Sequence, residues 1–304
     1  SSDLIHYDLT FATALVAVSG SLGIIIPPSI PYIMYCNASG ASISELFLAG
    51  FLPGVLIALC LMVYSYIYCK IHGEDKDKLN AKCMELRAKG LGTVLKEGFW
   101  ALMSPVIILG GIYGGICSPT EAATISIFYS LIVSLFIYRT IKIRDLPKIM
   151  LEGIHSYAPI LIILSAAVAF ARVITLMNVA TIVSEAVLSA ISSKVVILLL
   201  INVLLLFVGM IMDTGPAILV FTPVLLPVAE AIGVDPIHFG IIMCVNLAIG
   251  FVTPPMGANL FVASNLSKVS VFDIARKAVP FILAFLIALL LITFVPQISM
   301  FLLQ

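Results

Sequence analysis

Long apolar stretches, separated by short polar ones, run along the whole chain. A helix needs about 20 apolar residues to cross a bilayer. Stretches of about that length or longer are residues 11–35, 44–68, 99–116, 119–138, 155–177, 195–230, 238–265 and 279–303. Of the 304 residues, 62% are hydrophobic and 11% are charged, so the chain cannot cover itself with polar surface in water. The pattern therefore predicts an all-α, polytopic membrane protein that lies in a lipid bilayer.

The basic residues indicate which ends of these spans face the cytoplasm. Most of the Lys and Arg residues lie in three places, which are residues 70–96, residues 139–148 and the group Lys268, Arg276 and Lys277. The connections 36–43 and 231–237 contain neither Lys nor Arg. By the positive-inside rule, the three basic loops face the cytoplasm and these two connections face the outer side.

Two segments near the outer side do not fit a simple span. The segment 178–193 is too short to cross the membrane and mixes polar with apolar residues, which indicates a helix at the membrane interface. The run 195–230 is too long for one span, and the sequence DTGPA at 213–217 interrupts it. Because both ends of this run lie on the outer side, we expect a re-entrant hairpin whose tip is satisfied by protein or water at membrane depth.

An internal repeat relates the two halves of the chain. Residues 23–28 and 250–255 share the pattern GxxxPP, and Pro27 and Pro254 lie 227 positions apart. The same offset relates two further pairs of identical residues, Asp8 with Asp235 and Pro53 with Pro280. The charge pattern makes the first Pro-Pro span run outward and the second inward, so the repeats are inverted. Inverted repeats with interrupted helices are typical of secondary transporters.

Each Pro-Pro pair must interrupt its helix. Proline has no backbone N–H to donate, it clashes with the preceding turn, and it pushes the residue before it out of the helical region. Backbone carbonyls freed in this way can bind a hard cation such as sodium, since leaving them unsatisfied in hydrocarbon is costly. The alternative is a proline kink packed against neighbouring helices. The predicted sodium ligands are Ser19, Gly23, Ile26, Asn246, Gly250, Thr253 and Gly257.

The half-helices that begin after the breaks predict where an anion binds. A helix N-terminus presents N–H groups and a positive dipole end, which suits a carboxylate. The predicted substrate-binding residues are Ser29 and Asn259 beside the breaks, and Asp213, Thr214, Gly215 and Pro216 at the hairpin tip. For the polar residues near the breaks, the alternative is hydrogen bonding between packed spans. For Asp213 it is an N-cap, which is compatible with an ion-binding role.

Other chemistry has little support in the sequence. The four histidines form no HExxH pair, the six cysteines form no CxxC pair, and no nucleophile elbow or P-loop is present, so we expect a transporter rather than an enzyme. Lys plus Arg equals Asp plus Glu at 16 each, which gives no reason to expect a nucleic-acid partner. Ser118 and Glu121 fit a capping box. Arg172 is interpreted as a snorkelling side chain, with an anion-facing role as the alternative.

Five strings together resemble a known family. They are GIIIPPSIPYIMY (23–35), ISELFLAGFLPG (43–54), GGIYGGICSPTEAA (110–123), MDTGPAILVFTPVLLPVA (212–229) and GVDPIHFGIIMCVNLAIGFVTPPMGANLF (233–261). They are similar to the large membrane (M) subunit of TRAP transporters, the tripartite ATP-independent periplasmic family, and most similar to its sialic acid branch.

The resemblance implies a function and a set of partners. It implies a sodium-driven, elevator-type importer of the ion transporter superfamily in the bacterial inner membrane. Such an importer receives an organic acid, of the sialic acid or dicarboxylate class, from a soluble periplasmic binding protein and works with a small membrane (Q) subunit. Two alternatives stay open: a sodium/dicarboxylate symporter of the same superfamily that works without a binding protein, and a non-transporting membrane scaffold or intramembrane enzyme.

The repeat and the resemblance divide the chain into moving and fixed parts. The expected parts are residues 1–35 (transport domain, repeat 1), 36–98 (scaffold helix and basic connector), 99–194 (scaffold helices of repeat 2), 195–265 (transport-domain hairpin and broken helix of repeat 2) and 266–304 (C-terminal scaffold helix). The second broken helix is preceded by spans and a hairpin. By the logic of the repeat, we expect roughly 100 or more residues, with a first hairpin, before residue 1.

Overall fold

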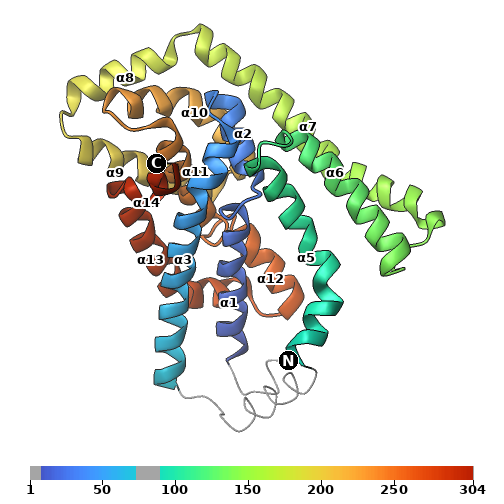
Figure 1. Cartoon of the computed structure of the whole chain (residues 1–304). Coiled ribbons are helices and arrows are strands. Elements are labelled where there is room, and N and C mark those ends of the chain that lie inside the picture. Colours follow the sequence, from blue (N-terminus) through green and yellow to red (C-terminus); the bar gives the residue numbers. More distant parts are fainter. Residues whose placement is uncertain (1–7, 73–89, 304) are drawn as a thin grey trace. The chain divides into compact units, whose positions relative to one another are not determined.

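The computed structural model describes residues 8–72 and 90–303, and every regular element in these ranges is a helix (Figure 1). Residues 1–7 and 73–89, which include most of the first predicted basic loop, lie outside these ranges. Seven of the described helices are long and apolar enough to cross a membrane, which confirms the all-α, polytopic prediction. They are α3 (Ile43–His72), α5 (Leu91–Tyr113), α6 (Pro119–Ile132, extended by Val133–Ile137), α7 (Leu146–Leu176), α9 (Lys194–Ile211), α10 (Thr214–Ala231) and α13 (Val271–Phe294).

The chain forms two compact units. One comprises residues 1–74 and 166–304, and the other comprises residues 75–165. In the second unit α5 packs against α6, and Tyr129 Oη donates a 2.7 Å hydrogen bond to Trp100 O between them. The predicted capping box at the start of α6 is confirmed, because Ser118 Oγ accepts from Glu121 N and the Glu121 carboxylate accepts from Ser118 N.

The first unit contains both predicted repeats, and their helix boundaries agree with the repeat. The first comprises α1 (Leu9–Gly20), a 3-10 turn (Ser21–Ile24) and α2 (Ile30–Ser39), and the second comprises α11 (Pro236–Gly250) and α12 (Ala258–Ser267). A shift of 227 positions brings the starts of α1, α2 and α3 to within one residue of the starts of α11, α12 and α13. The local chemistry also agrees, since Asp8 and Asp235 both cap their helices by accepting backbone N–H groups.

The two repeats are antiparallel. Helix α1 packs against α12, and α2 packs against α11, so the start of each repeat lies beside the end of the other (Figure 1). Helix α11 lies at the centre of this unit, where it contacts α2, α3, α9, α10 and α13. All of its residues from Ile237 to Gly250 are buried. Apart from His238 and Asn246 its side chains are apolar on every side, which suits such a position because the helix has no face to present to water.

Two further predicted elements are present. Helix α8 (Val179–Ala190) occupies the segment that the sequence assigned to the membrane interface. Helices α9 and α10 are separated only by Met212 and Asp213, and they contact each other, as the two arms of a hairpin do. Each arm has 18 residues. That this hairpin enters and leaves the membrane on the same side stays a prediction.

The prediction that the third basic group forms a loop is wrong. Helix α13 starts at Val271, so Arg276 and Lys277 lie in its first two turns and only Lys268 lies in the connection. Arg and Lys are good helix formers, and Asp273 in the first turn favours the positive end of the helix dipole. The charges therefore mark the end of a helix rather than a loop.

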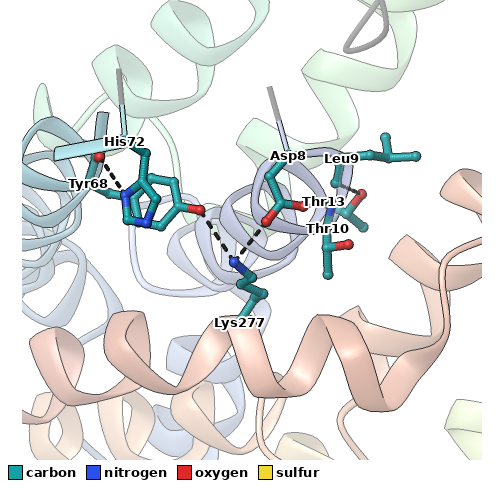
Figure 2. Close-up of polar contacts among 7 residues, drawn as sticks. All are labelled: Asp8, Leu9, Thr10, Thr13, Tyr68, His72 and Lys277. Carbon is teal, nitrogen blue, oxygen red and sulfur yellow. Dashed lines mark hydrogen bonds and ion pairs between the residues drawn. The ribbon is translucent and has the colours of Figure 1, made fainter. Parts of the chain in front are cut away.

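A polar and aromatic cluster joins the start of α1, the end of α3 and the start of α13 (Figure 2). Lys277 Nζ lies 2.8 Å from Asp8 Oδ2 and donates a 3.3 Å hydrogen bond to Tyr68 Oη. The Tyr68 ring stacks on Phe11 with centroids 3.6 Å apart. Partial burial raises the pKa of Asp8, but the hydrogen bond and charge of Lys277 and the backbone N–H groups outweigh it, so the pKa lies below its usual 3.8.

The ion pair predicts a pH-dependent contribution to stability. A lowered carboxyl pKa stabilises the fold above the unfolded-state pKa, and this contribution is lost as pH falls through the folded-state value. Both side chains are more than a third exposed, so Asp8→Asn should cost no more than about 1 kcal/mol. We expect a lower melting temperature at pH 7, and a difference that shrinks as the pH is lowered below 4. Because Lys277 also donates to Tyr68 Oη, Lys277→Met should still lower stability in the Asp8→Asn background, but by less than in the unmodified protein. Independent additive losses would contradict a direct interaction between Asp8 and Lys277.

Close packing of α9 on α11 gives a second prediction. A Cβ on Gly250 would lie 2.1 Å from Gly209 O, which is backbone and cannot turn aside. Gly250→Ala should therefore destabilise the protein by about 1–3 kcal/mol or more, measured by thermal unfolding in detergent. Gly153→Ala in α7 is the matched control, because a Cβ there has no atom within 4 Å. It should be neutral or stabilise by up to about 1 kcal/mol. Equal melting temperatures for the two variants would exclude the close contact.

Candidate functional site

The second helix break lies against the end of α9. Helix α11 ends at Gly250, and α12 begins at Ala258 after the turn that contains Pro254 and Pro255. Met256 N donates a 3.1 Å hydrogen bond to Met210 O, beside the contact between Gly209 and Gly250. The tip of the α9–α10 hairpin is thus attached to the second break through backbone groups.

The first helix break is closed by a serine cap. Ser29 Oγ donates a 2.5 Å hydrogen bond to Ile24 O and accepts a 3.4 Å hydrogen bond from Tyr32 N at the start of α2. Ser29 is buried, and these two hydrogen bonds connect its hydroxyl to the backbone on both sides of the break. Both Pro-Pro peptide bonds, Pro27–Pro28 and Pro254–Pro255, are cis.

Asn259 joins the two breaks. Its Nδ2 donates to Ala17 O at 3.1 Å and to Ser21 Oγ at 3.3 Å, both in the first repeat. Its backbone N donates to Phe251 O at 3.0 Å in the second break. Residues 21–29 and 251–257 therefore form one structural element, which we call the paired break.

Several carbonyl oxygens of the paired break are free. Within residues 8–72 and 90–303, the carbonyl oxygens of Gly23, Ile26 and Thr253 accept no hydrogen bond. Those of Gly250 and Gly257 are used, by Thr253 N and by Leu260 N and Phe261 N, respectively. Three of the five backbone oxygens predicted as sodium ligands are thus available to a cation. In the described part of the chain, His, Cys, Asp and Glu side chains do not gather in groups of three that would suit a transition metal.

The two side chains predicted as sodium ligands have different surroundings. Asn246 is fully buried, and its Nδ2 donates to Asn202 Oδ1 at 2.6 Å. Asn202 in turn donates to Thr293 Oγ1 at 3.2 Å. Ser19, at the corresponding position of the first repeat, is partly exposed. Sequence reasoning missed Asn202 and Thr293, although Asn202 is the one polar side chain in α9 after Lys194 and could have been noticed for that reason.

The hairpin tip lies between the second break and α2. Asp213 is exposed and caps α10 by accepting a 2.9 Å hydrogen bond from Thr214 N, which confirms the predicted N-cap. Gly215 faces Met34 on α2, since a Cβ there would lie 3.0 Å from Met34 Sδ. Pro216 lies in the first turn of α10. The structure thus connects the predicted tip residues to elements of both breaks, and their role in substrate binding stays a prediction.

The fold and the paired break define a class of protein: an all-α, multi-pass membrane protein with inverted repeats and interrupted helices, an architecture found in secondary transporters. Residues 5–298 match the family described as the tripartite ATP-independent periplasmic transporter, DctM component. The chain belongs to this family, as the sequence resemblance indicated, and is a multi-pass protein of the inner membrane.

Named relatives cover nearly all of the chain. It is 44% identical over 294 residues to an isethionate TRAP transporter permease protein of Oleidesulfovibrio alaskensis, with 96% of this chain and 45% of that protein covered. It is 38% identical to a C4-dicarboxylate TRAP transporter large permease protein of Pseudomonas aeruginosa, covering 97% of this chain and 67% of the relative. It is 35% identical to a sialic acid TRAP transporter large permease protein of Vibrio cholerae, covering 97% of this chain and 68% of that relative. The chain thus spans less than half of the first of these proteins and about two thirds of the other two.

The bridge between the breaks gives a third prediction. Asn259→Ala removes the hydrogen bonds to Ala17 O and Ser21 Oγ, so we expect a loss of about 1–2 kcal/mol in stability. Thermal unfolding in a sodium-free potassium buffer measures this loss. Asn37→Ala is the matched control, because Asn37 is an exposed asparagine of α2, and it should leave the melting temperature unchanged. Equal effects of the two changes would show that Asn259 does not hold the breaks together.

Proposed function

We propose that this chain forms the substrate-translocating core of a TRAP transporter large subunit, which imports an organic acid anion by sodium-coupled secondary transport. The observation that carries the proposal is the paired break, where free carbonyl oxygens of both repeats lie on one bridged element. Sodium is a hard cation that prefers oxygen ligands, and sites of this kind at interrupted helices are the usual coupling device in secondary transporters.

The charge of the substrate gives a reason for coupling. An organic anion that crosses a low-dielectric barrier alone pays a large desolvation cost, which bound cations offset. The N-termini of α2 and α12 begin at the paired break, and that of α10 begins at the hairpin tip. Helix N-termini favour negative charge. In the proposed mechanism sodium ions order these segments, and the anionic group of the substrate then binds between them.

We propose an elevator movement whose moving part includes α3 and α13. The sequence assigned these helices to a fixed scaffold. Their packing favours the other assignment, because α13 packs against α1 and α11, and α3 packs against α11 and α13, within the same compact unit as the paired break. A buried side-chain hydrogen bond, from Asn202 to Thr293, also joins α9 to α13. Sliding between these helices would break such contacts, whereas movement as one body keeps them.

Partners and substrate follow from the family. The family description names a tripartite, periplasmic system, which supports a small membrane (Q) subunit and a periplasmic substrate-binding protein as partners. The three relatives are named for isethionate, C4-dicarboxylates and sialic acid, all organic acid anions. The sialic acid relative is 35% identical to this chain and the isethionate relative 44%. The proposed substrate is therefore an organic acid anion, without preference for the sialic acid branch.

Uptake by the complete transporter in proteoliposomes tests the proposal. We expect uptake of a labelled isethionate, C4-dicarboxylate or sialic acid only with an inward sodium gradient and the cognate binding protein. Uptake that needs sodium but no binding protein would instead identify an independent symporter. Uptake that is unaffected by replacing sodium with potassium would exclude sodium coupling.

A variant at the second break gives the fourth prediction. Asn246→Ala should raise the sodium concentration for half-maximal uptake by about tenfold, since changes around a bound ion typically have that size. Asn265→Ala is the matched control, because Asn265 is exposed on α12, and it should behave like the unmodified transporter. Unchanged sodium dependence of Asn246→Ala would remove this residue from the ion site.

A further inference from the structure

A chain of buried polar side chains lies behind the second break. It runs from Thr293 on α13 through Asn202 on α9 to Asn246 on α11. The three side chains are 2%, 3% and 0% exposed, respectively. Buried polar groups of this kind are costly unless they are paired, so the direction of each hydrogen bond matters.

The direction of the chain is set at Thr293. The Thr293 hydroxyl donates a 2.8 Å hydrogen bond to Leu289 O, which is a carbonyl oxygen and can only accept. A hydroxyl has one hydrogen, so Thr293 Oγ1 must accept from its other neighbour. That neighbour, 3.2 Å away, is therefore the amide nitrogen of Asn202. The amide oxygen of Asn202 then faces Asn246.

Asn246 is oriented by the same logic. Its Nδ2 lies 2.6 Å from Asn202 Oδ1 and 2.8 Å from Ile242 O, two acceptors that take both of its hydrogens. Turning the amide over would place its oxygen against both acceptors. The Asn246 Oδ1 is thereby left as the free atom, fully buried and without a hydrogen-bond partner in the described part of the chain.

We propose that Thr293 and Asn202 are positioning residues that present Asn246 Oδ1 to a cation. The inference rests on the proposed function, in which that cation is sodium. An amide oxygen ligates a hard cation, whereas the NH₂ end of the same amide repels it. Asn246 lies four residues before Gly250, one helical turn from the point where α11 ends in the paired break. The hydroxyl on α13, acting through Asn202, and the Ile242 carbonyl together fix which end of the Asn246 amide the site receives.

This arrangement belongs to the second repeat alone. At the 227-residue offset, the counterparts of Asn246 and Thr293 are Ser19 and Tyr66. Ser19 is partly exposed, and Tyr66 is 69% exposed. The first break therefore has no equivalent oriented amide, and the two breaks offer different ligands to a cation.

Substitutions at Thr293 test the proposal in the complete transporter. Thr293→Val keeps the shape of the side chain and removes the hydroxyl, so Asn202 loses the acceptor that orients its amide. The orientation of Asn246 then depends on Ile242 O alone. Thr293→Ser keeps the hydroxyl. Thr222→Val is the matched control, because Thr222 is also a fully buried threonine of this unit and its hydroxyl donates to Met243 Sδ, outside the chain described above.

Two readouts are taken as sodium replaces potassium: the melting temperature and the rate of uptake in proteoliposomes. For Thr293→Val we expect the half-saturating sodium concentration to rise by about tenfold in both, with little change in the maximal rate. Thr293→Ser and Thr222→Val should stay close to the unmodified protein. If Thr293→Val does not accumulate, Asn202→Ala removes the acceptor of Asn246 and should shift the sodium dependence in the same direction.

The outcomes separate this inference from the proposed function. Sodium dependence in the unmodified transporter, with half-saturation unaltered in Thr293→Val, overturns the positioning role and leaves the proposed function standing. A Thr293→Ser variant as impaired as Thr293→Val would show a packing effect and also overturn it. A change in the maximal rate alone does the same. An unmodified transporter without any sodium dependence overturns both proposals.

Discussion

The constraint on which the rest of this structure depends is the pairing of backbone polar groups where two helices are interrupted by Pro-Pro. In a bilayer, water cannot satisfy an interrupted helix, so the protein must. Here the neighbouring elements do so: Ser29 caps the first break, Met210 O accepts from the second, and the side chain of Asn259 ties the two together. The carbonyl oxygens that remain free after this pairing are the backbone ligands of the proposed sodium site.

The two repeats share their backbone course, but their side chains differ. After a shift of 227 positions, corresponding helices start within one residue of each other, and the first helix of each repeat begins at a capping aspartate. The side chains at corresponding positions nevertheless differ. Asn259, which bridges the breaks, corresponds to Tyr32, and Lys277, which pairs with Asp8, corresponds to Gly50. Symmetry thus accounts for the two breaks, while each break has its own polar contacts.

Packing around α11 explains why α3 and α13 lie with the site rather than apart from it. The backbone of α9 contacts Gly250 directly, and a Cβ on Gly240 would lie 2.5 Å from the Tyr35 ring on α2. Interiors packed this closely transmit strain and do not slide easily. The repeat and the family resemblance suggested boundaries after residues 35 and 265, with the helices that follow them in a fixed scaffold. Hydropathy reports burial in lipid or protein alike, so it does not distinguish a helix of the scaffold from one packed on the site.

By itself, the sequence determined the features that depend on a few neighbouring residues. These include the helical class, the two breaks, and the caps at Asp213 and Ser118, because hydropathy, proline sterics and capping all act over one or two turns. The inverted relation of the breaks was also predicted, from the 227-residue offset and the positions of the basic residues. Only the tertiary structure decided which polar groups pair. Asn246 meets Asn202, 44 residues away, and Asn259 meets Ala17, 242 residues away. Such pairs depend on how whole helices pack, and no local pattern records which end of a buried amide is left free.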